Sequence, residues 1–365
     1  MNAIPAGIVS LQDYIDAAER RLSPEIWAYI AGSGADGRSR AANRADFDRH
    51  RLRPRVLRDL KGGHSRLTLL GEEIAHPILV APMAYHRLAH PDGEHATLLG
   101  AAARKAISVV SSQASTDMTE LAARAQGPLW FQLYFQYHRD DTLQLVRRAE
   151  DAGYKALVVT VDAPVNGIRN QEQRAGFSLP QGIHAVNLAG FATPRLHLSE
   201  GGSQVFDGLM QCAPTWADIA WLRDQTELPI LLKGILDPED AELALEHGAS
   251  GVILSNHGGR VLDAGLSALD ALPQVRARLG ARALVLMDGG IRRGTDVLIA
   301  RALGADAVLV GLPILSALAV GGAVGVAHAL DILRTEFEVA MALTGCKTLR
   351  DITSDTLWHS PPRQS

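Results

Sequence analysis

Short apolar runs alternate along the chain with longer stretches of helical spacing. Segments such as Thr142–Ala152 and Asp237–His247 have the periodicity of amphipathic helices. Strands that alternate with helices over roughly 260 residues predict an α/β fold, a single (β/α)8 TIM barrel, with a doubly wound sheet as the alternative. The eight runs that predict buried parallel strands are Pro77–Val80, Ile107–Val110, Leu129–Leu133, Ala156–Val161, Pro229–Leu232, Gly251–Leu254, Ala283–Met287 and Ala307–Val310.

The chain before residue 76 predicts helices. Ser10 and Asp13 have the pattern of a helix N-terminus, and Ser23-Pro24-Glu25 opens a second helix. Residues 32–37 have the glycine spacing of a dinucleotide-binding loop but follow a helix instead of a strand, so we interpret them as a helix cap and loop. We expect one domain over residues 1–365, with an N-terminal helical segment (1–75), a barrel (76–345) and a C-terminal tail (346–365).

Residues 178–216 follow the fourth predicted strand and form an interval too long for an ordinary connection. The interval is rich in glycine, proline and polar residues. Long loops of this composition are commonly lids or disordered segments. We therefore expect residues 185–210 to close over a substrate, or to lack order without it.

Composition excludes several classes of protein. Of 365 residues 47% are hydrophobic and 21% charged, as in ordinary globular proteins, and the net charge of −4 indicates no general affinity for nucleic acid or anionic membranes. Ala307–Leu330 carries no charged side chain, but glycines and a proline divide it, so we expect no membrane span. Two cysteines and the absence of a signal-like N-terminus favour a cytoplasmic location.

Polar residues or glycines follow nearly every predicted strand. In a barrel the carboxyl ends of all strands meet on one face, which is where such folds hold their active sites. The strand-end residues are Ser111, Gln113, Gln132, Tyr134, Thr160, Asp162, Lys233, His257, Arg260, Asp288, Gly289, Gly290 and Gly311.

The segment Ser255–Asp263 carries the most specific chemistry. His257 can move a proton near neutral pH, and the planar guanidinium of Arg260 suits a carboxylate. A simple helix-capping loop is the structural alternative. Gly289, Gly290 and Gly311, with the charge of Arg292, indicate a phosphate site after the last two strands.

Two other chemistries are not indicated. His86, His90 and His95 are spaced loosely enough to suggest metal ligands, but no pattern of carboxylates accompanies them. We expect no metal site. Neither cysteine follows a strand end, and no triad with a nucleophilic serine is suggested.

Five motifs together resemble one family, the FMN-dependent α-hydroxy-acid oxidases and dehydrogenases. The resemblance extends from about Tyr14 to about Ile352. Residues 81–86 and 166–169 are closer to the lactate and hydroxymandelate oxidases than to glycolate oxidase. The motifs are FQLY (131–134), TVDAP (160–164), LLKGIL (231–236), SNHGGRVLD (255–263) and DGGIRRGTDV (288–297).

The resemblance implies oxidation of an (S)-2-hydroxy acid to a 2-oxo acid, with the reduced FMN reoxidised by O2 to give H2O2. It makes His257 the base and Asp162 the carboxylate that holds its imidazole. Arg260 and Arg169 would bind the substrate carboxylate, with Tyr29 and Tyr134 beside them. The FMN contacts would come from Pro82, Met83, Ala84, Ser111, Gln132, Thr160, Lys233, Ser255, Asp288, Gly289, Gly290, Arg292, Gly311 and Leu312.

Two positions depart from the family. Leu312 stands where the family usually has an arginine on the FMN phosphate, so FMN binding is expected to be weak unless another cation, such as Arg293, reaches the site. Gln113 stands where glycolate oxidase has a tryptophan, which argues against glycolate as substrate. The family also implies a homotetramer or homo-octamer.

Two other functions stay open at this stage. One is a dehydrogenase that passes electrons to a quinone or another acceptor in place of oxygen. The other is a non-redox barrel that binds a phosphorylated ligand.

Overall fold

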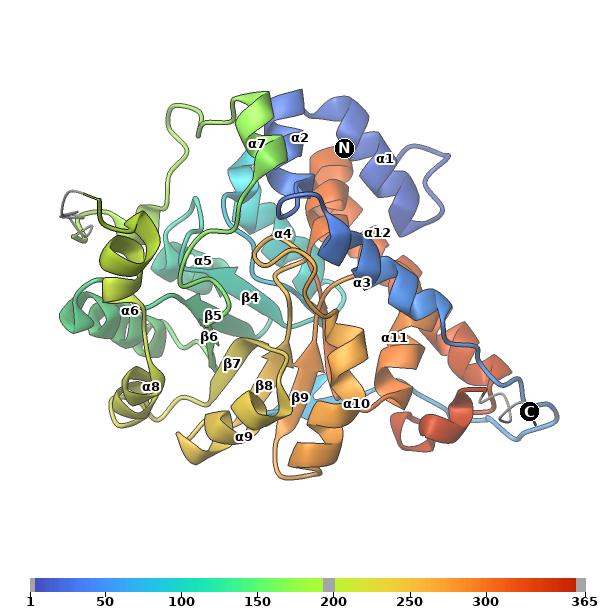
Figure 1. Ribbon diagram of the computed structural model, residues 1–365. Helices are drawn as coiled ribbons and strands as arrows, with labels where there is room; N and C mark the ends of the chain where they lie inside the picture. Colours follow the sequence, from blue (N-terminus) through green and yellow to red (C-terminus); the bar gives the residue numbers. More distant parts are fainter. Residues whose placement is uncertain (1–3, 193–200, 359–365) are drawn as a thin grey trace.

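The eight predicted strands form one closed parallel barrel (Figure 1). The computed structural model describes residues 4–192 and 201–358. The strand order is β10-β3-β4-β5-β6-β7-β8-β9, so the barrel prediction is confirmed and the doubly wound alternative is wrong. The strands are β3 (Ile78–Val80), β4 (Ser108–Ser111), β5 (Leu129–Leu133), β6 (Leu157–Thr160), β7 (Ile230–Ile235), β8 (Gly251–Leu254), β9 (Leu284–Met287) and β10 (Ala307–Val310).

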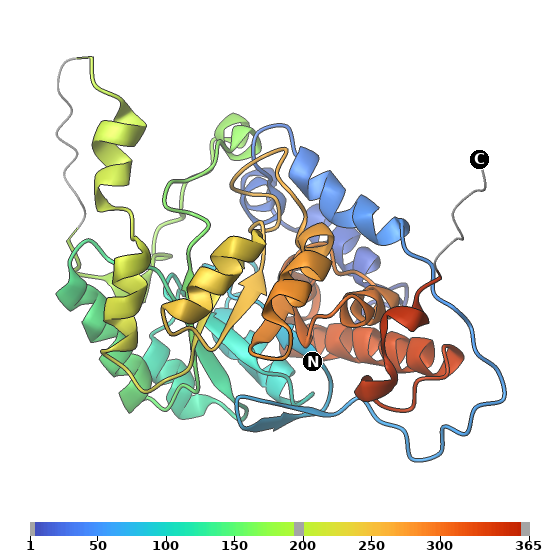
Figure 2. The same ribbon diagram turned by 60° about the horizontal axis from the view of Figure 1, so that its bottom comes forward.

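Helices surround the barrel and connect its strands. Figures 1 and 2 show the first and last helices of the chain on one side of the barrel, opposite α6 and α8. The connecting helices are α4 (Gly93–Ala102), α5 (Met118–Arg124), α6 (Arg139–Asp151), α8 (Trp216–Arg223), α9 (Pro238–Glu246), α10 (Ala268–Leu279) and α11 (Gly294–Ala302), and α12 (Leu312–Leu343) follows the last strand.

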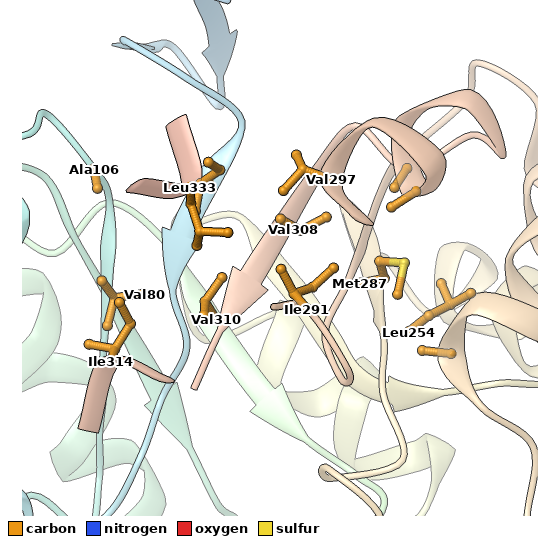
Figure 3. Close-up of a cluster of buried hydrophobic side chains, with 14 of the residues drawn as sticks. Val80, Ala106, Leu254, Met287, Ile291, Val297, Val308, Val310, Ile314 and Leu333 are labelled. Carbon is orange, nitrogen blue, oxygen red and sulfur yellow. The ribbon is translucent and has the colours of Figure 1, made fainter. Parts of the chain in front are cut away.

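Each barrel strand buries both of its faces. Successive side chains of a strand point to opposite sides, so one set fills the barrel and the other packs under the helices. On β9, Val285 and Met287 belong to the outer layer and Leu286 to the inner one. Figure 3 shows this outer layer, in which Val308 and Val310 lie among side chains from neighbouring strands and helices. Burial on both faces explains why these strands are continuous apolar runs.

A two-stranded hairpin, which the sequence did not predict, packs on the barrel interior. Its strands are β1 (Leu67–Leu69) and β2 (Glu72–Ile74), paired antiparallel. Leu69 and Ile74 share a buried cluster with Ala156, next to the amino end of β6. The hairpin therefore lies toward the amino ends of the strands, which leaves the opposite end for a site.

The N-terminal helices begin where the sequence predicted. Helix α1 (Leu11–Arg21) starts with a capping box between Ser10 and Asp13, and α2 (Pro24–Ala31) is capped by Ser23. Gly32 caps the end of α2, as expected for the glycine-rich loop. A third helix, α3 (Arg38–Asp48), follows this loop.

Helix α12 explains the long uncharged stretch near the C-terminus. Among the described residues α12 alone is long and apolar enough to cross a membrane, but 78% of its most apolar window is buried within the protein. It packs against α1, α4 and α11, and bends at Gly322. Tyr14 of α1 contacts it through a 2.9 Å hydrogen bond to His328 Nδ1.

The long interval after β6 contains more structure than a loop. It holds α7 (Asn170–Ala175), short helical turns at Val186–Leu188, Gln204–Gly208 and Leu209–Cys212, and residues 193–200 lie outside the described part of the chain. Asn187 is buried and accepts a 2.8 Å hydrogen bond from the Met118 amide. The start of the predicted lid is thus anchored to α5, and closure by the rest of residues 185–210 stays a prediction.

The approach of α3 to the carboxyl end of β9 gives a test of the fold. A Cβ on Gly290 (φ +79°) would stand 2.0 Å from the carbonyl oxygen of Asn43, whereas a Cβ on Gly153 (φ +82°) would meet nothing within 4 Å. Gly153→Ala should lower the free energy of unfolding by only ~1–2 kcal/mol, because alanine is strained in a left-handed backbone conformation. Gly290→Ala should lower the melting temperature clearly more, because α3 must move. Equal melting temperatures for the two variants would contradict this packing.

Candidate active site

A histidine and a carboxylate meet at the ends of β8 and β6. His257 Nδ1 lies 3.0 Å from Asp162 Oδ1, and the second carboxylate oxygen of Asp162 is buried without a hydrogen-bond partner in the described structure. Burial works to raise the pKa of Asp162, but its hydrogen bond to His257 and the charges of His257 and Lys233 hold that pKa below its usual value. Asp162 therefore stays ionised at neutral pH beside the imidazole.

The loop that carries His257 is fixed by helix α3. The side-chain amides of Asn43 and Asn256 exchange two buried hydrogen bonds of 2.9 and 2.8 Å. Asn256 Oδ1 also accepts from the Gly259 amide at 2.9 Å, and Asp263 accepts from the Ser39 amide at 2.8 Å. His257 itself adopts a left-handed backbone (φ 57°), which these bonds hold in place.

Two arginines lie side by side through one shared carboxylate. Glu172 Oε1 accepts from Arg260 Nη2 at 2.9 Å and from Arg169 Nη1 at 3.0 Å. Arg260 Nη1 also donates to the backbone carbonyls of Tyr29 and Gly32. Burial and the nearby charge of Arg169 lower the pKa of Arg260. Sequence reasoning predicted both arginines but missed Glu172, which lies three residues after Arg169 on α7.

Aromatic rings line the cavity near these arginines. Tyr29 stacks on Phe177 with ring centroids 4.4 Å apart and lies 6.1 Å from the Tyr85 ring. The Arg260 guanidinium lies over the Tyr29 ring at 5.4 Å. Burial raises the pKa of Tyr29 to about 12 and also raises that of Tyr134, so both phenols keep their protons at neutral pH.

Lys233 of β7 is a buried cation between two strand ends. Its side chain is 5% exposed, and Nζ lies 2.8 Å from Ser255 Oγ and 3.0 Å from Asp288 Oδ2. Burial opposes the charge of Lys233, but the carboxylates of Asp288 and Asp162 outweigh it and raise the lysine pKa. Asp288 Oδ1 is buried with no partner in the described structure, so it is free to accept a hydrogen bond from a ligand.

Neutral polar groups line the other strand ends. Gln132 Oε1 accepts from Ser111 Oγ at 3.1 Å, and Gln132 Nε2 donates to Thr160 Oγ1 at 3.0 Å. This chain of bonds joins the ends of β4, β5 and β6. Residues 82–84, after β3, line the same cavity.

These groups surround one cavity of about 1580 Å³. Pockets for one small molecule span ~300–1,000 Å³, so there is room for a cofactor and a substrate together. Every predicted site residue lines it except Asp162 and Ser255, which lie behind His257 and Lys233 and contact them. Sequence reasoning did not predict several other lining residues, among them Arg40, Arg44, Tyr85, Glu172 and Phe177.

The end of the cavity near β9 and β10 carries positive charge. The lining there consists of Gly289, Gly290, Gly311 and Leu312 together with Arg40, Arg44 and Arg292. The prediction that Arg293 could serve this end is wrong, because its guanidinium pairs with Glu336 at 3.0 Å and does not line the cavity.

The three histidines considered as metal ligands have separate partners. His86 Nδ1 lies 2.9 Å from Thr97 Oγ1, and His95 Nε2 lies 3.0 Å from Glu120. Within the described residues, no group of three or more His, Cys, Asp and Glu side chains is placed to hold a metal ion.

Comparison with known proteins identifies the family of this chain. The sequence profile of the FMN-dependent dehydrogenase family matches residues 18–359. The chain belongs to this family. It is 47% identical over 350 residues to an L-lactate oxidase of Roseobacter sp., covering 96% of this chain and 94% of that protein. It is 40% identical over 359 residues to the glycolate oxidase of Spinacia oleracea, covering 97% of both.

A solved structure shares the fold as well as the sequence. Mandelate oxidase with benzoyl-formic acid superposes with a TM-score of 0.87 at 40% identity, covering 96% of this chain and 98% of that one. The chain is therefore an FMN-dependent 2-hydroxy-acid oxidase with O2 as its electron acceptor. A non-redox phosphate-binding barrel is excluded by this membership.

The cavity fits FMN on its own chemistry. The unpartnered Asp288 Oδ1 can accept from a ribityl hydroxyl, and the buried Lys233 can lie beside an electron-rich ring edge. The glycines at 289, 290 and 311 let a phosphate approach the backbone, and cations surround them.

Glu172 is the residue that lets two cations lie together, and it can be tested directly. Glu172→Gln keeps the size and the acceptor oxygen but removes the charge, so Arg260 and Arg169 repel each other. We expect the free energy of unfolding to fall by about 1–3 kcal/mol in the holoenzyme without a 2-oxo acid. A 2-oxo acid, whose carboxylate replaces the lost charge, should raise the melting temperature by more than in wild type.

Glu227→Gln is the matched control, because Glu227 is exposed and does not line the cavity. Melting temperatures are measured with and without the 2-oxo acid. If Glu172→Gln behaves like the control in both conditions, Glu172 does not hold the arginine pair.

Proposed function

We propose that this oxidase acts on (S)-2-hydroxy acids with an apolar side chain, with His257 as the base. The observation that carries the proposal is that a carboxylate-bound histidine and a pair of arginines line the same cavity as a cofactor-sized site. A 2-hydroxy acid presents a carboxylate and a hydroxyl on neighbouring carbons. The arginine pair suits the carboxylate, and the histidine suits the carbon that bears the hydroxyl.

The substrate carboxylate would bind to Arg260 and Arg169. Glu172 takes one N–H from each guanidinium, and the Arg169 Nε is buried without a partner in the described structure. The remaining N–H groups can form charge-assisted hydrogen bonds with a second carboxylate. The hydroxyl of Tyr134, protonated at neutral pH, is available to donate to the substrate.

His257 would accept one of the two hydrogens of the substrate as a proton. Its Nδ1 is held by Asp162, which leaves Nε2 as the free basic nitrogen. The charge of Asp162 also stabilises the imidazolium that forms, a general device of acid–base catalysis. Bound FMN supplies the chemistry of accepting two electrons, which O2 then takes to give H2O2.

The FMN contacts keep the roles that the sequence resemblance implied. Lys233 would stabilise negative charge at the flavin edge, with Ser255 and Asp288 holding its ammonium. Gln132, Ser111 and Thr160 would bind the ring, as would residues 82–84. Gly289, Gly290, Arg292 and Gly311 would bind the ribityl and phosphate end, where Leu312 adds no charge.

An apolar side chain on the substrate suits the aromatic lining. Tyr29, Phe177 and Tyr85 offer ring surface beside the arginines, and Leu179 also lines the cavity. Gln113 is placed where the family's glycolate oxidases carry a tryptophan, so more space is left there. The relatives named for L-lactate and mandelate are consistent with side chains that range from a methyl to a phenyl group.

Kinetics of H2O2 formation with L-lactate, (S)-mandelate and glycolate test this function. An apolar group that fills a pocket contributes ~10–200-fold to kcat/KM, so both L-lactate and (S)-mandelate should exceed glycolate at least tenfold. Glycolate turned over as well as L-lactate would refute the apolar preference. Flavin reduction without H2O2 formation would indicate an acceptor other than oxygen.

A cytoplasmic location and a homotetramer or homo-octamer stay predictions. In keeping with a reducing compartment, Cys212 is exposed and free, and Cys346 is buried and free.

A further inference from the structure

We propose that Arg40 of helix α3 binds the FMN phosphate with Arg292 and supplies the charge that Leu312 does not. Arg40 would then contact the cofactor from a helix outside the strand ends. This contact does not depend on which 2-hydroxy acid the enzyme oxidises.

Neither the Arg40 nor the Arg292 guanidinium forms an ion pair with a carboxylate in the described part of the chain, although Asp296 interacts electrostatically with Arg292. Burial lowers the pKa of Arg40, and Glu19 offsets this only in part, from beyond ion-pair distance. Burial and then the charges of Arg44 and Arg40 lower the pKa of Arg292 to about 10, and Arg292 Nη1 donates to the carbonyl of Ile291. A buried charge without a partner is costly, so two guanidiniums that line the same cavity favour an anionic ligand there.

The position of α3 brings Arg40 to the correct end of the cavity. A Cβ on Gly259 would stand 2.5 Å from the Arg40 amide nitrogen, so this helix touches the loop after β8. One turn later Asn43 packs against Gly290, after β9. Helix α3 thus runs beside the ends of β8 and β9, and Arg40 lines the cavity together with Gly290, Arg292 and Gly311.

The neighbouring arginines are less suited to this role. Arg44, one turn further along α3, already donates to Asp296 Oδ2 and to the Gly290 carbonyl, both at 2.6 Å. Arg293 pairs with Glu336. Unlike Arg44 and Arg293, Arg40 forms no close ion pair with a carboxylate within the described structure.

Backbone dipoles favour an anion at the same place. Helix α12 begins at Leu312 with Gly311 as its N-cap, and both residues line the cavity. The N-terminal end of a helix carries partial positive charge and attracts phosphate. Leu312 provides its N–H there, but its side chain is apolar. The Arg40 guanidinium would add a full positive charge to these backbone dipoles.

The test compares two flavins on the full chain. A charge-assisted hydrogen bond contributes about ten- to 150-fold in affinity. Arg40→Ala should therefore raise the Kd for FMN at least about tenfold, measured by flavin fluorescence on dilution of the holoenzyme. The Kd for riboflavin, titrated into the flavin-free full chain, should change by less than about twofold, because riboflavin lacks the phosphate.

Two further variants separate a phosphate contact from a structural effect. Arg38→Ala is the matched control, because Arg38 is an exposed arginine two residues away on α3 that does not line the cavity. Leu312→Arg in the Arg40→Ala background should restore most of the lost FMN affinity. The same substitution in the wild-type chain should increase FMN affinity much less.

Three results would overturn the assignment. The first is an FMN Kd for Arg40→Ala within about threefold of wild type. The second is an equal loss of FMN and riboflavin affinity, which would make Arg40 a structural residue. The third is a failure of Leu312→Arg to recover any FMN affinity in the Arg40→Ala background.

Discussion

The site depends on a buried ammonium that carboxylates from two other strand ends hold in place. Lys233 of β7 pairs with Asp288 after β9, and it interacts electrostatically with Asp162 after β6. Asp162 in turn holds His257, after β8. Removing one partner of a buried pair costs ~3–5 kcal/mol, so each of these charges fixes the others. The closed barrel makes the network possible, because it brings four consecutive strand ends together.

Cations outnumber close carboxylates at both ends of the cavity. Near the substrate end, Glu172 shares one oxygen between Arg260 and Arg169, which leaves donors for another carboxylate. Near the phosphate end, neither Arg40 nor Arg292 forms a close ion pair with a carboxylate among the described residues, which leaves both guanidiniums for a ligand that brings its own charge. The same principle thus explains why the cavity takes two anionic molecules.

The barrel and most of the site could be predicted from sequence because both follow from local patterns. Strands buried on both faces are uninterrupted apolar runs, and polar residues directly after them must lie on one rim. The hairpin β1–β2 was missed because three-residue strands carry little periodic signal. Its turn at Leu70-Gly71, with φ values of 47° and 84°, was the available cue.

The sequence also did not predict the cavity residues that helices contribute. Arg40 and Arg44 are one turn apart and so share a face of α3, but nothing local indicates that this face meets the barrel rim. Glu172 likewise needed the position of α7 beside α2. Such contacts depend on how helices pack on the barrel, which the spacing of residues within one helix does not determine.

Anaerobic reduction of the bound flavin by L-lactate tests the central claim most directly. The account predicts that His257→Ala retains FMN in wild-type amount but is reduced ~10²–10⁴-fold more slowly, as for a positioned acid–base group. Reduction within about fivefold of the wild-type rate, at equal flavin content, would remove His257 and its Asp162 partner from the reaction.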